Sequence, residues 1–95
     1  MELFTIRRRS NWPDVAALEA AAAKSSAEGE KMSDEVRWIR SYVVEETDGK
    51  LGTLCIYEAT SPEAIRRHAG NTGMSADEIT KVADTVIVRE DPVAA

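Results

Sequence analysis

One local signature occurs twice in this chain, as Asn-Trp-Pro-Asp at residues 11–14 and as Thr-Ser-Pro-Glu at residues 60–63. Both copies combine a capping residue, a proline and an acid. This pattern is typical of a helix N-terminus, because proline is tolerated in the first turn and a carboxylate suits the helix dipole. We expect one helix within residues 10–29, capped by Asn11, and a second within residues 60–73, capped by Thr60 and ended by Gly73.

Each expected helix lies between β-rich runs. Alternation around Phe4 and Ile6 predicts a strand over residues 2–8, and the runs 35–46 and 50–59 flank Asp48-Gly49, a strong hairpin-turn signal. A last run, residues 76–90, predicts a strand with a break or bulge near Asp84. The order βαββαβ predicts a ferredoxin-like α+β fold, a four-stranded antiparallel sheet with two helices on one face.

Length and composition favour one soluble domain. The 95 residues, 43% hydrophobic and 31% charged, suit a single domain over residues 1–90 with a loose tail over 91–95. The net charge of −5 argues against a nucleic-acid partner. We expect no signal peptide and no membrane span, and the single cysteine agrees with a cytoplasmic location. We interpret the run Arg7, Arg8 and Arg9 as a solvated strand end, the alternative being an anion-binding patch.

The hairpin sorts side chains onto two faces. A two-residue turn places Tyr42 opposite Cys55 and Arg40 opposite Tyr57. An aliphatic set would then pack on the helices: Ile39, Val43, Leu54 and Ile56. The other face would form a ligand pocket or a homodimer interface through Trp38, Arg40, Tyr42, Cys55 and Tyr57. A longer or bulged turn would invert this assignment.

His68 is the only histidine. It follows Ile65 by three residues on the apolar stripe of the second expected helix, so it should point toward the sheet or its edge. It is a packed or capping residue, a metal or ligand contact, or a general acid or base. Cys55 is either a small apolar residue or a nucleophile. The chain contains no glycine-rich phosphate loop, no CxxC pair and no HExxH motif.

The stretches VRWIRSYV, CIYEA, SPEAIRRHAG and ADEITKV, within residues 36–82, resemble a group of small bacterial ferredoxin-like proteins. The group is known as a domain of unknown function and includes a nickel-binding member. The resemblance implies a dimeric protein that binds nickel or another divalent metal. It makes His68 the candidate metal ligand, and it gives Cys55, Tyr42 and Tyr57 matching positions without an assigned role.

Three functions remain open from the sequence. The leading hypothesis is a small dimeric ligand-binding protein that binds nickel or another divalent metal. The alternative is an enzyme similar to the dimeric α+β barrel monooxygenases and isomerases, with a small organic molecule or haem in a pocket. The third is a structural or regulatory dimer without a small ligand.

Overall fold

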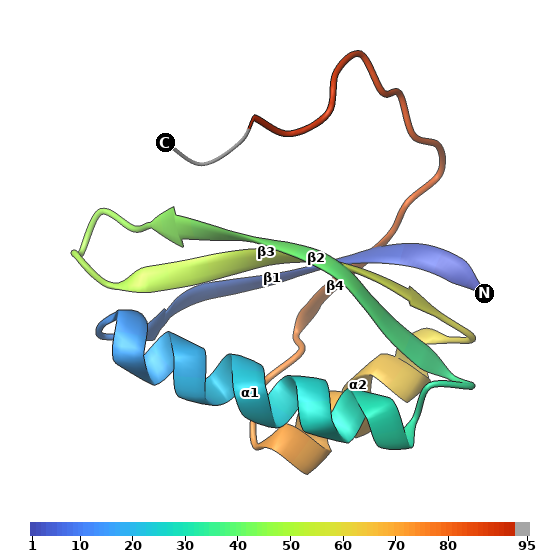
Figure 1. Ribbon diagram of the computed structural model, residues 1–95, viewed down its shortest axis with the longest axis horizontal. Coiled ribbons are helices and arrows are strands. Elements are labelled where there is room, and N and C mark those ends of the chain that lie inside the picture. Colours follow the sequence, from blue (N-terminus) through green and yellow to red (C-terminus); the bar gives the residue numbers. More distant parts are fainter. Residues whose placement is uncertain (93–95) are drawn as a thin grey trace.

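Six elements follow one another in the order expected from the sequence, and the computed structural model describes residues 1–92 of the chain. The sheet is antiparallel throughout, with the strand order β2-β3-β1-β4. Both helices cover one face of it (Figure 1), which confirms the predicted ferredoxin-like fold. The elements are β1 (Glu2–Trp12), α1 (Val15–Lys31), β2 (Val36–Glu45), β3 (Leu51–Ala59), α2 (Pro62–Thr72) and β4 (Glu78–Lys81).

The helix starts differ from those predicted. The strand β1 continues through Trp12, so the cap of α1 is Asp14, whose carboxylate accepts a hydrogen bond from the Ala17 N–H, and not Asn11. The α2 cap is Ser61 and not Thr60; its hydroxyl accepts from the Ala64 N–H. In both helices a side chain that follows the predicted cap satisfies one of the free N–H groups of the first turn.

The end of α2 is as predicted. Gly73 takes a left-handed conformation with φ of 74°, and its N–H closes the last turn on the carbonyls of Ala69 and Gly70. A residue without a Cβ adopts this conformation at little cost.

The hairpin between β2 and β3 overturns the predicted register. Glu45 pairs with Leu51, so residues 46–50 form a longer connection than a two-residue turn. Farther along, Trp38 lies opposite Tyr57 while Arg40 lies opposite Ile56, which makes the intervening residue of β2 a bulge. Together the longer loop and the bulge invert the predicted faces of β3 and of Trp38, whereas Arg40, Tyr42 and Val43 lie on the faces predicted for them.

The core therefore lies on a different set of residues from the one predicted. The helix side of β3 carries Cys55 and Tyr57, which are buried, while Leu54 and Ile56 lie on the opposite face. On β1 the predicted alternation holds. The buried hydrophobic cluster consists of Phe4, Ile6, Met32, Val36, Cys55, Tyr57, Ala59, Ala64 and Ile65.

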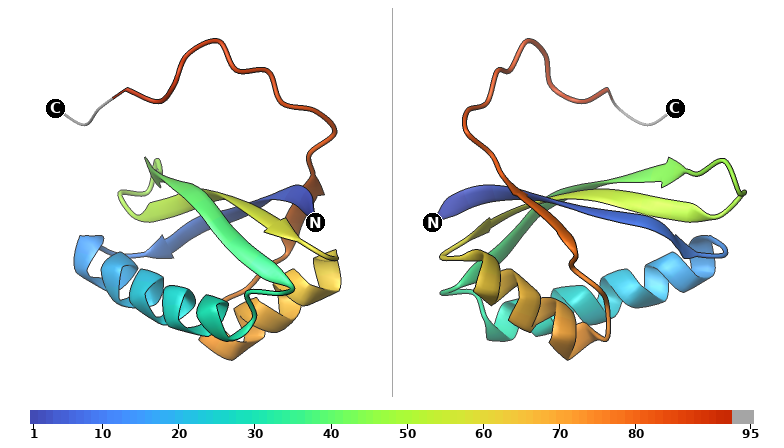
Figure 2. Two further views of the ribbon diagram at one scale, coloured as in Figure 1. Left: turned by 45° about the vertical axis from the view of Figure 1, so that its right-hand side comes forward. Right: turned by 180° about the vertical axis from the view of Figure 1, so that it is seen from behind.

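After β4 the chain forms an extended arm instead of the predicted bulged strand. It leaves the sheet after Lys81 and arches over the face opposite the helices (Figure 2). Of the tail predicted over residues 91–95, residues 93–95 lie outside the described part. No helix within residues 1–92 is long and apolar enough to cross a membrane.

Candidate functional site

Aromatic rings form a layer between the sheet and the helices. The Trp38 ring stacks on Tyr57 with 6.1 Å between centroids and 7° between planes, and Tyr57 lies 5.8 Å from the His68 ring. Ser25 of α1 joins the layer: its hydroxyl lies 3.2 Å from the Tyr57 hydroxyl, and its carbonyl lies 2.9 Å from His68 Nε2. Burial raises the pKa of the Tyr57 phenol, so this group stays protonated at neutral pH.

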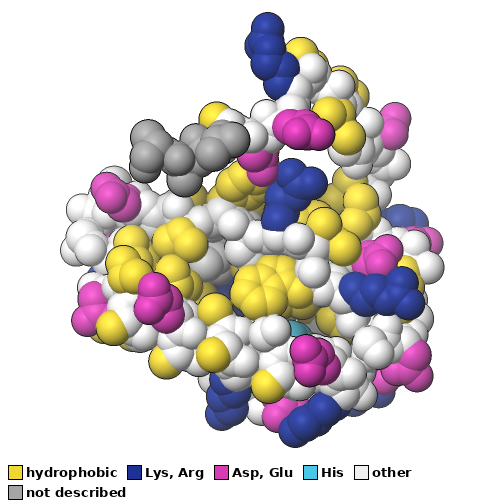
Figure 3. Space-filling view, viewed as in Figure 1, with side chains coloured by type: hydrophobic (Ala, Val, Ile, Leu, Met, Phe, Trp, Pro, Cys, Tyr) yellow, Lys and Arg dark blue, Asp and Glu magenta, His cyan; other side chains and the backbone are white. Residues whose placement is uncertain are grey.

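A cleft of about 460 Å³ opens beside this layer, between α1 and the sheet. It exists because α1 presents small side chains, Ala21 and Ala22, to a part of the sheet that carries the equally small Ser41, Thr53 and Cys55. Hydrophobic side chains gather where α1 faces the sheet (Figure 3). The larger apolar residues of the lining are Trp12, Leu18, Trp38, Ile39, Val43 and Met74.

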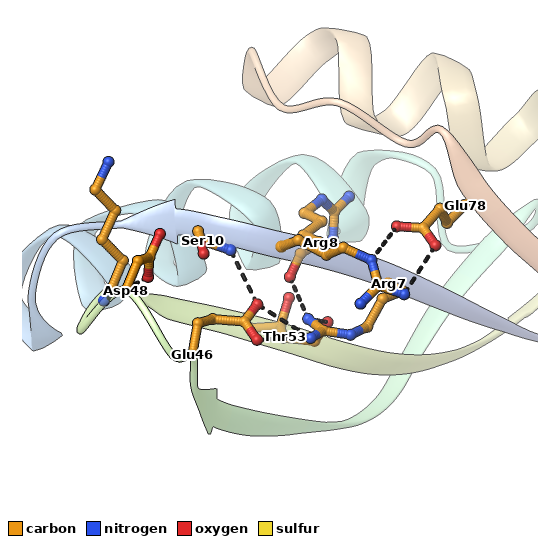
Figure 4. Close-up of polar contacts among 9 residues, drawn as sticks. Arg7, Arg8, Ser10, Glu46, Asp48, Thr53 and Glu78 are labelled. Atoms are coloured by element: carbon orange, nitrogen blue, oxygen red, sulfur yellow. Dashed lines mark hydrogen bonds and ion pairs between the residues drawn. The ribbon is translucent and has the colours of Figure 1, made fainter.

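Arg8 supplies a charge to this apolar cleft. Its side chain is only 4% exposed and lies on the helix side of β1 (Figure 4). Its Nε donates to the Ser75 carbonyl at 2.8 Å, and its Nη1 lies 3.8 Å from Cys55 Sγ. Arg8 thus contradicts our interpretation of residues 7–9 as a solvated strand end.

Two hydroxyls complete the polar groups of the cleft on the sheet side. Ser41 Oγ accepts a hydrogen bond from Trp38 Nε1 at 2.7 Å and donates to Cys55 Sγ at 3.0 Å. Thr53 Oγ1 is buried and has no hydrogen-bond partner within the described residues. A buried hydroxyl without a partner is costly, so Thr53 has an unused capacity to bind a ligand atom.

The opposite face of the sheet carries the two remaining predicted site residues. Arg40 Nη1 pairs with the Asp91 carboxylate at 3.1 Å, and the Tyr42 hydroxyl donates to the same carboxylate at 2.9 Å. Asp91 thereby ties the arm back to β2. A second cavity of about 840 Å³ lies between the arm and this face, where Leu3, Ile56 and Val86 are among its lining residues.

The predicted site residues are therefore only partly brought together. Trp38, Cys55 and Tyr57 line the helix-side cleft, Arg40 borders both cavities, and Tyr42 lines only the cavity beneath the arm. Sequence reasoning missed Arg8, Thr53 and Trp12. Arg8 had a readable signal, because it continues the alternation of Phe4 and Ile6 onto the buried face.

The residues of one chain do not fit a nickel centre. Nickel favours imidazole and thiolate ligands, and this chain offers one of each. His68 is 2% exposed with Nε2 engaged by the Ser25 carbonyl, while Cys55 contacts Arg8 and Ser41. Within residues 1–92, no three His, Cys, Asp or Glu side chains group closely enough to hold a metal ion. His68 as a metal ligand stays a prediction.

Comparison with known proteins places this geometry in context. The sequence profile of the family described as nickel responsive protein SCO4226-like matches residues 4–82. Comparison with curated proteins gave no match. The crystal structure of SCO4226 from Streptomyces coelicolor A3(2) is similar to this chain, with a TM-score of 0.71 and 22% sequence identity, and the match covers 88% of this chain and 99% of the other. This likeness shows the shared fold.

Proposed function

Because the chain belongs to the family of nickel responsive SCO4226-like proteins, we propose that it is a small dimeric ligand-binding protein that takes part in a response to nickel or another divalent metal. Its ligand lies in the cleft between α1 and the sheet. The observation that carries this proposal is the cleft itself, about 460 Å³ lined mainly by apolar side chains with a few polar groups. These are the features of small-molecule sites.

Cytoplasmic action belongs to the same proposal and is supported by the free, buried thiol of Cys55. The enzymatic alternative stays a prediction. Among the described residues, the hydrogen-bonding contacts of Cys55 are Arg8 and Ser41, and neither side chain is a general base for a nucleophile.

Filling the cleft tests the ligand site. Ala22 lines the cleft, and Ala23 is its exposed neighbour on α1, so Ala22→Phe and Ala23→Phe add the same ring in two settings. We expect the neutral dye Nile red to bind the wild type with enhanced fluorescence. Ala22→Phe should weaken binding by at least about tenfold, because the ring occupies the ligand's space, whereas Ala23→Phe should change it by less than about twofold. Equal loss in both variants, or in neither, would contradict a ligand site in the cleft.

The metal part of the proposal has a separate test. Thermal unfolding of untagged protein is measured with and without nickel chloride, for the wild type and for His68→Gln. A ligand bound only by the folded state, at a hundredfold excess over its Kd, stabilises by about 2.7 kcal/mol. We expect the wild-type melting temperature to rise by several degrees, with the metal held by ligands from both chains of the proposed dimer, because one chain does not supply a complete set within residues 1–92.

The rise should be equal in His68→Gln, since His68 is buried and its Nε2 already has a partner. For each protein, the melting temperature with nickel is compared with that of the same protein in a metal chelator. The effect of the substitution on stability therefore cancels. No rise in the wild type would remove nickel from the proposal. A rise that disappears in His68→Gln would instead support the metal-ligand role expected from the family resemblance.

The dimer is proposed on new grounds, because Trp38 and Tyr57 lie on the helix side and not on the open face. Its support is now the exposed apolar surface opposite the helices. Tyr42 remains 40% exposed there, and the bulge residue Ile39, which borders both cavities, is 47% exposed. The arm is even less covered, since Val86, Ile87 and Val88 are 85%, 77% and 81% exposed. A second copy of the chain packed against the arm and the exposed part of this sheet face would bury both surfaces.

A further inference from the structure

Arg8 is a buried cation without a carboxylate partner. Its two neighbours in sequence each have one: Arg7 pairs with Glu46 at 2.8 Å (Figure 4), and Arg9 pairs with Glu78 at 2.8 Å. Among the ion pairs formed within residues 1–92, none includes Arg8, although it is the most buried of the three. A guanidinium remains charged at any physiological pH, and an unpaired buried charge is costly.

Neutral groups meet only part of the hydrogen-bonding capacity of Arg8. A guanidinium has five N–H donors. The Ser75 carbonyl takes one through Nε, and Cys55 Sγ, a weak acceptor, takes another through Nη1 at 3.8 Å. Thr53 lines the same cleft with a buried hydroxyl that has no partner within residues 1–92. The cleft therefore gathers unused donors beside the unpaired charge of Arg8, while Arg40, at the rim of the lining, is exposed and paired with Asp91.

The remainder of the cleft is suited to an apolar molecule. Trp12 and Trp38 provide flat aromatic surfaces, and Leu18, Val43 and Met74 provide aliphatic ones. A ligand that satisfies every part of this lining has an apolar body and one anionic end.

We propose that the cleft binds a small molecule with an apolar body and a single carboxylate, which pairs with Arg8 and accepts a hydrogen bond from Thr53. This inference rests on the proposed function, in which the cleft is the ligand site. A carboxylate matches the planar fork of a guanidinium and its single charge. A phosphate monoester carries nearly two charges, and Arg8 alone would leave the second unmatched, because Arg40 is already paired with Asp91.

Glu19 is the acidic residue of the lining, and it is exposed on α1. Water screens its charge at the surface. Its carboxylate disfavours an anion only weakly, and Glu19→Gln should bind the carboxylate at least as well as the wild type does.

The test uses three probes that share one apolar body: 4-phenylbutanoate, the neutral 4-phenylbutanamide and the cationic 4-phenylbutylamine. Both tryptophans of the chain line the cleft, so intrinsic tryptophan fluorescence reports binding directly. We expect the wild type to bind the carboxylate at least about tenfold more tightly than the amide or the amine, as a hydrogen-bonded charge pair implies.

Two arginine variants locate the effect. Arg8→Met removes the buried charge while keeping an apolar side chain of similar length, and Arg9→Met makes the same change at the exposed neighbour. Arg8→Met should bind the carboxylate and the amide equally, at about the affinity of the wild type for the amide. Arg9→Met should retain the wild-type preference for the carboxylate. Thr53→Val keeps Arg8 and should weaken only carboxylate binding, by about two- to tenfold.

The wild-type comparison judges the inference even if Arg8→Met does not fold. Equal binding of the three probes, tighter binding of the amine, or no binding of any of them would overturn it. So would a full carboxylate preference in folded Arg8→Met. The proposed function is tested separately: it fails if Ala22→Phe and Ala23→Phe bind the neutral dye Nile red with the same affinity.

Discussion

Arg7, Arg8 and Arg9 are consecutive arginines in three different settings. The side chains of a strand alternate between faces, so Arg8 is buried on the helix side while Arg7 and Arg9 share the other face. Figure 4 shows Arg7 and Arg8 on opposite sides of β1. Arg7 pairs with Glu46 through both carboxylate oxygens and also donates to the carbonyls of Arg8 and Thr53. Composition identifies these residues only as a basic run. The alternation of side chains along β1 is what places them in different environments.

The pairing of Glu46 makes a pH-dependent contribution to stability. Hydrogen bonds from Arg7 lower the pKa of the Glu46 carboxyl, and burial opposes this in part. A folded-state pKa below the unfolded value of about 4.3 gives stability that is present above that value and is lost as the pH falls through the folded-state pKa. Glu46→Gln should therefore be less stable than the wild type at pH 7, and this difference should vanish in more acidic solution.

Urea unfolding at a series of pH values measures this effect. Glu30→Gln is the matched control, because Glu30 is exposed and takes part in no ion pair within residues 1–92. A Glu46→Gln difference that persists unchanged in acid would show that the charge of Glu46 is not its cause.

At the scale of single elements, β3 lies very close to β1 and to Glu46 at one position, Gly52. Gly52 lies where β3 passes the Arg7 and Glu46 pair, and a Cβ built there would lie 2.5 Å from the Arg8 carbonyl oxygen and in contact with Glu46 Oε2. The absence of a side chain at Gly52 lets the strands approach and lets the ion pair lie across them.

Gly52→Ala should destabilise the fold by about 1–3 kcal/mol, because a backbone atom must move to admit the new methyl group. Gly70→Ala is the control, since a Cβ at Gly70 on α2 meets nothing within 4 Å. It should stabilise by about 0.5–1 kcal/mol through helix propensity. The two free energies of unfolding, measured by urea titration, should change in opposite directions. A stable Gly52→Ala would mean that β1 and β3 are not held at this spacing.

The element order and family were predictable from the sequence, but the register was not. Helix caps, prolines and alternation are local signals, and they predicted the βαββαβ order and the end of α2 at Gly73. The bulge at Ile39 and the longer loop before Leu51 depend on pairing with β3, which no local pattern records. This single error in the predicted register placed Trp38 and Tyr57 on the wrong face, and the cleft was therefore not predicted.

At the scale of the whole molecule, the two faces of the sheet differ in how they are covered. The helices cover one face, and the arm arches over the other, held there by Asp91 against Arg40 and Tyr42. A cavity of about 840 Å³ lies beneath the arm, and the apolar side chains Val86, Ile87 and Val88 of the arm are largely exposed. This arrangement is what a proposed second copy would complete.

The arm provides the test of the dimer. We expect multi-angle light scattering to give about twice the 10.4 kDa mass of one chain for the wild type. Ile87→Asp should raise the dimer dissociation constant by at least about tenfold, because burying one isoleucine side chain contributes about 1.5–3 kcal/mol and each dimer contains two. Val15→Asp adds the same charge at another exposed apolar residue, on the helix layer, and should leave the mass unchanged. A monomeric wild type would end the dimer proposal, and a dimer broken only by Val15→Asp would move the interface to the helices.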